Sequence, residues 1–353
     1  MTRTFKRLLV TGGAGFIGSN FVRRTLERHP YEVVVLDKLT YAGNRENLAP
    51  VAGDPRFTFV AGDIADPAAV REAMDGCDAV LNFAAESHVD RSIMEGGDFV
   101  RTNIVGTQTL LDAARSLAVP TFLHVSTDEV YGDVAAGASV EGDPFHTRSP
   151  YSAAKGGAEL FVIAAHSTYG MNTLVTRGSN TYGPYQYPEK LLPIAITNVL
   201  DDEPVSVYGD GMQVRDWLHV DDHCAGIERV LHDGTPGEAY NVGAEHDGEG
   251  GHGRSNIAVL REMLRTLGKP ESLLQFVGDR PGHDRRYSLN CGKLRGVGWQ
   301  TEVPFAEGLA QTVRWYAEHR DWWEPLKRDA GYRAYFRRNY TERDKLLSGT
   351  TTR

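Results

Sequence analysis

The chain has 353 residues, of which 41% are hydrophobic and 24% are charged, and its formal net charge is −9. This length accommodates a sizeable core and two lobes, and the composition is ordinary for a soluble globular protein. The negative charge argues against a general nucleic-acid or anionic-membrane binder, although local basic residues can still line a pocket for an anionic substrate.

The three cysteines, Cys77, Cys224 and Cys291, are widely separated and fit neither a metal-ligand spacing nor a disulfide framework. We interpret them as buried thiols in a reducing compartment, and we expect no metal site. No segment approaches the roughly 20 apolar residues needed to span a bilayer. Because the N-terminus also enters a predicted strand without a preceding apolar stretch, we expect a cytoplasmic protein.

The first predicted strand, Arg7–Thr11, is followed at once by a glycine-rich turn and then by a helical pattern. Gly12, Gly15 and Gly18 have the spacing of a dinucleotide-binding fingerprint, whose glycines let the backbone approach a pyrophosphate at a helix N-terminus. The second predicted strand ends at Asp37, where an acidic side chain accepts hydrogen bonds from ribose hydroxyls and repels a 2′-phosphate. The pattern therefore favours NAD over NADP as the cofactor.

Strand and helix patterns continue to alternate along the chain. Short apolar runs typical of buried strands occupy residues 32–36, 57–61, 79–83, 122–126 and 173–177. An amphipathic pattern at 99–118 is long enough for a full helix. This alternation predicts an α/β fold with a Rossmann-type, doubly wound parallel sheet, in which ligands bind at the carboxyl ends of the strands.

Turn-forming residues at 178–184 mark the point where the chain leaves this sheet. We predict an NAD-binding domain formed by residues 1–177 and about 217–242. A smaller, mixed α/β lobe for the substrate is predicted at 178–216 and about 243–330, followed by a C-terminal extension at 331–353. Residues 243–256 are glycine-rich and are predicted to form an exposed loop, and we interpret His246 and His252 within it as solvated rather than metal-binding.

The stretch from Ser126 to Lys155 carries the residues that suggest chemistry. Asp128 and Glu129 follow an apolar run, and two carboxyl groups at a strand end can supply an acid and a second base for different steps of one reaction. Tyr151 stands four positions before Lys155, so that both side chains lie on one helix face. A nearby ammonium lowers the pKa of a phenol from about 10 toward neutral pH, which would make the phenolate a base for a sugar hydroxyl.

These motifs closely resemble those of the extended short-chain dehydrogenase/reductase superfamily and, within it, the nucleoside-diphosphate-glucose 4,6-dehydratases of the dTDP-glucose type. The resemblance extends from residue 8 to about 327. Its most specific segments are 37–44, 84–92, 126–132, 182–186, 188–190 and 279–287. Epimerases and decarboxylases of the superfamily share the glycine turn and the Tyr151/Lys155 pair, but they do not usually carry the Asp-Glu dipeptide that stands here at 128 and 129.

The resemblance implies dehydration of dTDP-glucose to a 4-keto-6-deoxyglucose nucleotide with tightly held NAD. Tyr151, its pKa lowered by Lys155 and the nicotinamide charge, would take the proton of the 4-hydroxyl while C4 gives hydride to NAD. Glu129 would then remove the C5 proton, and Asp128 would protonate the departing 6-hydroxyl before the hydride returns to C6. Asp128 must then be protonated near neutral pH, which desolvation and its neighbour Glu129 can produce. Thr127 would hydrogen-bond the 4-oxygen.

By the same resemblance, further residues would contact the two ligands. The NAD-binding residues would be Gly12, Gly15, Phe16, Ile17, Gly18, Asp37, Lys38, Leu39, Thr40, Asp63, Ile64, Phe83, Ala84, Ala85, Ser87, Thr102, Tyr151 and Lys155. The dTDP-sugar would be held by Ser87, Thr127, Asn180, Lys190, Leu191, Ser206, Tyr208, Arg215, Asn256, Arg280 and His283. The basic members of this set suit a diphosphate, which needs charge-assisted donors. Two stretches depart from the family pattern: Thr181 replaces a usual Asn, and the loop 244–254 is longer than usual.

Alternative functions stay open at this point. A UDP-glucuronate decarboxylase or a nucleotide-sugar 4-epimerase would share the oxidation at C4, but Asp128 and Glu129 would have no role in either. A non-enzymatic NAD sensor would commonly lose the Tyr-Lys pair, which this chain keeps. Thymine and uracil differ by one methyl group, worth about 1 kcal/mol of burial, so the base also stays open. Finally, relatives usually pair through two helices from each subunit, which implies a homodimer with a four-helix interface formed by 99–118 and the helix that begins at Tyr151.

Overall fold

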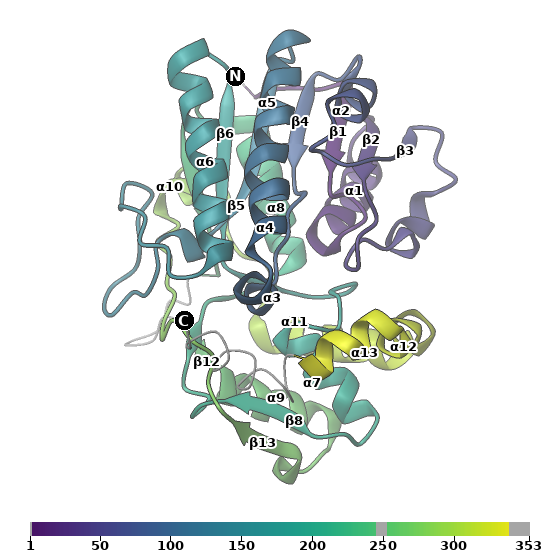
Figure 1. Cartoon of the computed structure of the whole chain (residues 1–353), viewed down its shortest axis with the longest axis vertical. Coiled ribbons are helices and arrows are strands. Elements are labelled where there is room, and N and C mark those ends of the chain that lie inside the picture. The colour runs from purple at the N-terminus through teal and green to yellow at the C-terminus, as the bar shows by residue number, and fades with distance from the viewer. Residues whose placement is uncertain (1, 245–252, 339–353) are drawn as a thin grey trace, which may run out of the picture.

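A computed structural model describes residues 2–244 and 253–338 of the chain. His246 and His252 of the glycine-rich loop lie outside these ranges, as do residues 339–353 of the predicted C-terminal extension. Figure 1 shows a large sheet with helices on both faces and, below it, a smaller group of helices and short strands. No helix of the described ranges combines the length and the hydropathy needed to cross a membrane.

The main sheet has seven parallel strands in the order β11-β6-β5-β4-β1-β2-β3. Its strands are β1 (Arg7–Thr11), β2 (Glu32–Asp37), β3 (Phe57–Ala61), β4 (Ala79–Asn82), β5 (Thr121–Thr127), β6 (Thr173–Gly178) and β11 (Ala239–Val242). Because the chain adds strands outward in both directions from β1, a crevice for a ligand opens at the carboxyl ends of β1 and β4. The predicted doubly wound sheet is confirmed.

Helices cover both faces of this sheet. The helices are α1 (Phe16–Arg28) and α8 (Val220–Asp233) on one face, and α2 (Pro67–Met74), α5 (Thr107–Ser116) and α6 (Pro150–Tyr169) on the other. Side chains alternate between the two faces, so that Leu8 and Val10 pack with α1 and α8 whereas Leu9 packs with α2, α5 and α6. Burial on both faces explains why these strands read as continuous apolar runs.

The helix predicted at 99–118 is not regular. The chain forms α4 (Gly96–Phe99), then the π-helical segment η2 (Val100–Gly106), and only then α5. Within η2, the amide of Asn103 donates to the carbonyl of Glu86 at 3.0 Å and accepts its N–H at 2.8 Å. The segment η2 therefore anchors the residues that follow β4. Such π-helical turns often occur at functional sites.

The smaller lobe has its own apolar core. Its helices are α7 (Leu191–Leu200), α9 (Asn256–Leu267), α11 (Phe305–Glu318), α12 (Arg320–Arg328) and α13 (Ala330–Phe336). Three pairs of short strands in the described chain lie outside the main sheet: β7 (Asn180–Tyr182) with β10 (Trp217–His219), β8 (Val205–Tyr208) with β13 (Leu274–Val277), and β9 (Val214–Arg215) with β12 (Arg254–Ser255). The β7–β10 pair contributes side chains to the cores of both lobes. The loop predicted at 243–256 is therefore wrong at its end, where Arg254 and Ser255 pair with β9.

Shorter elements complete the described chain. They are η1 (Arg45–Val51), α3 (Val89–Met94), η3 (Asp128–Val130), η4 (Glu271–Leu273) and α10 (Gly292–Gly296).

Candidate active site

A cavity of about 300 Å³ opens at the carboxyl ends of the sheet strands, beside the glycine turn. Gly12 has a φ of 67°, and a Cβ there would lie 2.6 Å from the backbone nitrogen of Ala84. A Cβ on Gly18 would lie 2.4 Å from the carbonyl oxygen of Gly12. Only glycine therefore lets the turn, α1 and the end of β4 approach so closely.

The N-terminus of α1 forms one wall of this cavity. Its N-cap is Gly15, which has no side chain to occupy the first N–H groups, and the first turn carries no acidic residue. Phe16, Ile17 and Gly18 line the cavity. Free N–H groups and the helix dipole favour an anion there, so this wall suits the pyrophosphate of a dinucleotide.

Asp37 lies at the end of β2 in the same cavity. Its carboxylate accepts the backbone N–H of Ala14 at 2.9 Å and that of Leu39 at 2.8 Å. Burial raises the pKa of Asp37, and these two hydrogen bonds oppose the rise. A carboxylate has about four acceptor positions, so acceptors remain for ribose hydroxyls in the cavity.

The cavity brings together most of the predicted cofactor residues, namely Gly12, Gly15, Phe16, Ile17, Gly18, Asp37, Lys38, Thr40, Ile64, Phe83, Ala84, Ala85, Ser87, Thr102 and Tyr151. Three others do not line it. Asp63 binds Arg101 at 2.5 Å instead, Leu39 is exposed with a φ of 54°, and Lys155 is buried, with its ammonium on the carbonyl oxygen of Val125. Thr181, which departs from the family pattern, does line the cavity, and its hydroxyl lies 2.7 Å from Nδ1 of His223.

The predicted catalytic residues meet where β5 ends and α6 begins. The hydroxyl of Thr127 accepts the N–H of Glu129 and donates to Oδ1 of Asp128, both at 3.3 Å, which fixes the short η3 turn. A capping box formed by Ser149 and Ser152 starts α6 and places Tyr151 in its first turn. Thr127, Asp128, Glu129 and Tyr151 all line the cavity.

The two adjacent carboxyl groups have different electrostatic surroundings. Burial is the largest cause that raises the pKa of Asp128 far above its usual value, and the charges of Glu129 and Asp216 add to it. Burial also raises the pKa of Glu129, but the cations of Arg280 and Arg215 oppose the rise. Asp128 is therefore suited to hold a proton and Glu129 to give up its own, which is the division of roles expected of an acid and a base.

The predicted lowering of the Tyr151 pKa is wrong for the protein alone. Burial raises the pKa of Tyr151 above its usual value, and the negative charges of Glu129 and Asp128 raise it further. The ammonium of Lys155 donates to the carbonyl oxygen of Val125 at 2.6 Å, and burial lowers the pKa of Lys155 to about 8. The phenol thus lies among carboxyl groups, whereas the lysine is held by a strand carbonyl.

A second cavity of about 180 Å³ adjoins the first and shares Glu129, Asn180, Glu189 and Lys190 with it. It contains the remaining predicted substrate residues, namely Leu191, Ser206, Tyr208, Arg215, Asn256, Arg280 and His283. Among the described residues, Asn180 and Asn256 each keep a buried Oδ1 without a hydrogen-bond partner, which a ligand can satisfy.

Cations hold fixed positions along this second cavity. Arg280 donates to Asp90 at 3.0 Å, and Lys190 donates to the carbonyl oxygen of Ser87 at 2.6 Å. Arg215 lies 4.3 Å from the ring centre of Tyr287. Three buried or partly buried cations in one cavity suit an anionic ligand such as a diphosphate, which needs charge-assisted donors.

Some cavity residues were not among the predicted site residues. Asp90, Glu189 and Tyr287 line the second cavity, and all three lie inside sequence segments that carry the family resemblance. Their place in these segments is the sequence feature by which they could have been found. Phe336 also lines this cavity, but it lies in the predicted C-terminal extension and no sequence pattern marks it.

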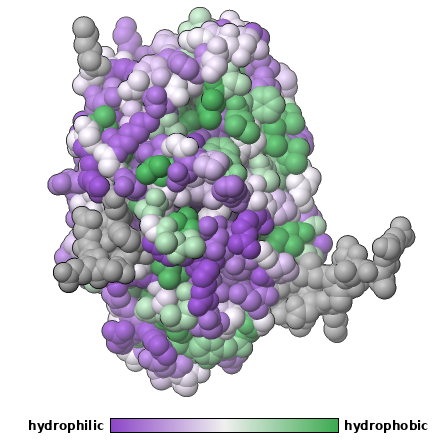
Figure 2. Space-filling view, turned by 90° about the vertical axis from the view of Figure 1, so that its left-hand side faces the viewer, coloured by the Kyte–Doolittle hydropathy of each residue, from purple (hydrophilic) through white to green (hydrophobic). Residues whose placement is uncertain are grey.

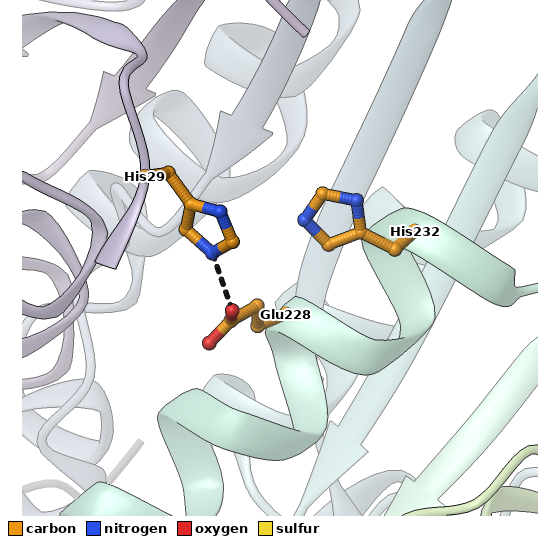
Figure 3. Close-up of side chains that lie close together, drawn as sticks. All are labelled: His29, Glu228 and His232. Atoms are coloured by element: carbon orange, nitrogen blue, oxygen red, sulfur yellow. Dashed lines mark hydrogen bonds and ion pairs between the residues drawn. The ribbon is translucent and has the colours of Figure 1, made fainter. Parts of the chain in front are cut away.

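A further group of titratable side chains, His29, Glu228 and His232, lies at the opposite end of α1 (Figure 3). Their potential metal-ligand atoms lie within 4.8 Å of one another. Glu228, however, already accepts hydrogen bonds from Arg24 at 2.8 Å and from His29 at 2.5 Å. Nδ1 of His232 lies 2.7 Å from the carbonyl oxygen of Arg3 instead. Glu228 thus joins α8 to α1 through Arg24 and His29, away from the candidate active site.

Known proteins resemble this chain over most of its length. The family described as GDP-mannose 4,6 dehydratase matches residues 9–312. A dTDP-glucose 4,6-dehydratase of Streptomyces niveus is 50% identical over 327 residues, which are 91% of this chain and 96% of the relative. The low-salt glycan biosynthesis protein Agl12 of Haloferax volcanii is 47% identical over 88% of this chain and 98% of its own length.

Solved structures agree. DesIV of Streptomyces venezuelae, a dTDP-glucose 4,6-dehydratase with NAD and TYD bound, is 52% identical, with a TM-score of 0.87 over 91% of this chain and 100% of its own. The UDP-glucose 4-epimerase of Thermus thermophilus in complex with NAD is 32% identical, with a TM-score of 0.81 over 89% and 99%. The chain therefore belongs to the dTDP-glucose 4,6-dehydratase family of the extended short-chain dehydrogenase/reductase superfamily.

Proposed function

We propose that this protein converts dTDP-glucose to dTDP-4-keto-6-deoxyglucose and water with NAD as a regenerated cofactor. The observation that carries the proposal is the position of Asp128 and Glu129. Both line the dinucleotide cavity beside Tyr151, and Glu129 also lines the cation-rich second cavity. An epimerase or a decarboxylase would need the oxidation at C4 but not this pair of carboxyl groups.

The residues of the first cavity fit NAD. The glycine turn and the N-terminus of α1 would hold the pyrophosphate, and Asp37 would accept the ribose hydroxyls. Bound there, NAD would supply the hydride acceptor for the sugar C4 and the hydride donor for C6, and also a positive charge to oppose the carboxyl groups that raise the pKa of Tyr151. The buried negative charge of Asp37 disfavours a 2′-phosphate, and so NADP.

Side chains of this chain move the protons. Tyr151 takes the proton of the 4-hydroxyl, whose oxygen Thr127 orients. The resulting 4-ketone acidifies the C5 proton, and Glu129 removes it. Asp128 gives its proton to the 6-oxygen as the C6–O bond breaks, so that water leaves. Glu129 finally returns a proton to C5. The opposite surroundings of the two carboxyl groups support these roles.

The second cavity would hold the nucleotide diphosphate. Lys190, Arg215 and Arg280 would bind the phosphate oxygens, and the unpartnered Oδ1 of Asn256 would accept a hydrogen bond from the base. The preference for thymidine is supported by the relatives that are named dTDP-glucose 4,6-dehydratases.

The direct test is incubation of the purified protein with dTDP-glucose in deuterated water, followed by mass spectrometry and NMR of the sugar nucleotide. We expect the loss of one water and deuterium at C5, and we expect Glu129→Gln to abolish both. Turnover of UDP-glucose to its 4-epimer, or decarboxylation of UDP-glucuronate, with dTDP-glucose unchanged, would rule the proposal out.

We further infer that the protein is a homodimer. Hydrophobic side chains of η2 and α6, namely Val100, Val105, Leu160 and Phe161, are between 44% and 56% exposed. These two elements pack side by side, and they coincide with the helices that relatives are expected to use for pairing. Figure 2 shows hydrophobic surface at its upper right. This edge is the front of the molecule in Figure 1, where α6 and α5 lie. A second subunit would cover it.

A further inference from the structure

The last described helix, α13, contributes to the substrate cavity although neither the family match nor the sequence motifs extend to it. The family match ends at residue 312. Phe336 of α13 nevertheless lines the second cavity together with Lys190 and Glu129. In Figure 1 this helix, in yellow, lies in the upper part of the smaller lobe, on the side that faces the large sheet.

One tyrosine of α13 holds the backbone that leads to Lys190. The buried Tyr332 donates its hydroxyl hydrogen to the carbonyl oxygen of Pro188 at 2.8 Å, and its ring lies edge-on to that of Tyr187. Asp329 caps the helix by accepting the N–H of Tyr332 at 3.1 Å. The carbonyl two residues before Lys190 is thus bound to a helix with a defined start.

A second tyrosine, Tyr335, supports the side chain of Glu189. The guanidinium of Arg91 lies between two rings, 3.7 Å from the centre of Tyr41 and 3.8 Å from that of Tyr335. Its Nε donates to Glu189 at 3.0 Å, and the Glu189 side chain is only 2% exposed. An arginine held between two aromatic faces keeps the orientation that this buried ion pair requires.

Tyr335 also acts through His88. Nε2 of His88 lies 3.3 Å from the carbonyl oxygen of Glu189, and its Nδ1 lies 3.1 Å from the hydroxyl of Tyr335. Because a carbonyl only accepts, Nε2 carries the hydrogen, and in the neutral ring Nδ1 must accept from the tyrosine. Burial lowers the pKa of His88, which favours this neutral form. Tyr335 therefore contacts two of the groups that hold Glu189, namely Arg91 and His88.

We propose that Tyr335 and Tyr332 of α13 are positioning residues, which hold 188–190 so that Lys190 is fixed beside Glu129 and the diphosphate of the substrate. Lys190 is suited to this because it lines both cavities and is itself anchored on Ser87. The inference rests on the proposed function and assigns to it a part of the chain outside the family match.

The test compares two substitutions at Tyr335. Tyr335→Phe keeps the ring over Arg91 and removes the hydroxyl that bonds His88, so we expect kcat/KM for dTDP-glucose to fall about fivefold, the value of one hydrogen bond. Tyr335→Leu removes both contacts, and we expect a fall of more than about tenfold, mainly through KM. We also expect the acid limb of the pH profile to move to higher pH, because Glu129 loses part of the Lys190 charge that lowers its pKa.

The matched control is Tyr169→Leu. Tyr169 also lies against an arginine, with Arg115 4.3 Å from its ring centre, but it is exposed at the end of α6 and lines neither cavity. This variant should keep the wild-type KM and pH profile. A Tyr335→Leu protein with a lower Tm but an unchanged KM and pH profile would show that α13 only stabilises the fold, and the proposal would be wrong.

A binding measurement separates this proposal from the proposed function. Calorimetric titration with dTDP needs no turnover, and we expect Tyr335→Leu to bind dTDP about tenfold more weakly than the wild type, while Tyr169→Leu binds equally well. An inactive wild type that still shows this difference would contradict the proposed reaction and leave the role of α13 supported. Equal dTDP affinity in all three proteins would overturn the role of α13, whatever the activity.

Discussion

The division of work between Asp128 and Glu129 can be separated experimentally, because each residue acts on a different bond. Asp128→Asn keeps an oxygen that accepts from Thr127 but carries no acidic proton. We expect water loss to fall by about 10²–10⁴-fold, while Glu129 still exchanges the C5 proton. NMR of the recovered dTDP-glucose from deuterated water should then show deuterium at C5 without product.

Glu129→Gln is the matched variant, since it should lose the exchange as well as the product. Undiminished water loss in Asp128→Asn would show that another group supplies the proton to the 6-oxygen. The sequence predicted this pair and the raised pKa of Asp128, which burial and Glu129 produce. It did not predict the further charges of Arg280, Arg215 and Asp216, because these reach the pair only through the fold.

We expect the buried ammonium of Lys155 to lower the stability of the folded protein. Burial lowers its pKa from 10.5 to about 8, so below pH 8 the folded state carries a charge that it disfavours. Between pH 8 and 10.5 the unfolded chain binds the proton and the folded chain does not, so this penalty disappears as the pH rises. Lys155→Met should therefore raise the free energy of unfolding at pH 7 by up to about 3 kcal/mol, and by much less near pH 10.

Chemical denaturation at both pH values checks this, and activity should be lost throughout. The exposed Lys6 offers the control, because Lys6→Met should change stability by no more than about 0.5 kcal/mol at either pH. A Lys155→Met protein that is less stable than the wild type at pH 7 would mean that the bond to Val125 outweighs the cost of burying the charge.

At the scale of whole elements, a buried ion pair joins the helix of Tyr151 to the turn of Asp128. Arg177 of β6 donates to Glu159 of α6 through Nε at 2.9 Å, and through Nη1 it donates to the hydroxyl of Tyr131, which follows η3. Removing one partner leaves a buried charge unpaired, so Glu159→Gln should cost about 3–5 kcal/mol. Urea unfolding measures this directly.

The double variant Glu159→Leu/Arg177→Met tests the cause. It removes both charges, so it should recover a large part of the lost stability, because buried apolar residues replace such pairs at little cost. The loss of unfolding free energy in the double variant could instead equal the sum of the losses in Glu159→Leu and Arg177→Met. The pair would then contribute through the packing of Arg177 rather than through its charge.

Elements differed in how well the sequence predicted them, for identifiable reasons. The six predicted strands match the observed bounds to within one residue at either end, because strands buried on both faces are continuous apolar runs. The strand β11, with the sequence Ala-Tyr-Asn-Val, was not predicted because Asn241 interrupts its apolar run. The π-helical η2 was not predicted either, since hydrophobic periodicity does not reveal a local change of helical register.

At the scale of the whole molecule, the exposed apolar side chains of η2 and α6 determine the expected assembly. We expect the purified protein to have the mass of a dimer by light scattering. A charge at the centre of this surface should be buried unpaired in the dimer, so Leu160→Glu/Phe161→Glu should give a monomer. Phe276→Glu is the control, because Phe276 is 59% exposed on β13, in the other lobe, and its substitution should leave the dimer intact. A monomeric wild type, or a double variant that still has the mass of a dimer, would place the interface elsewhere.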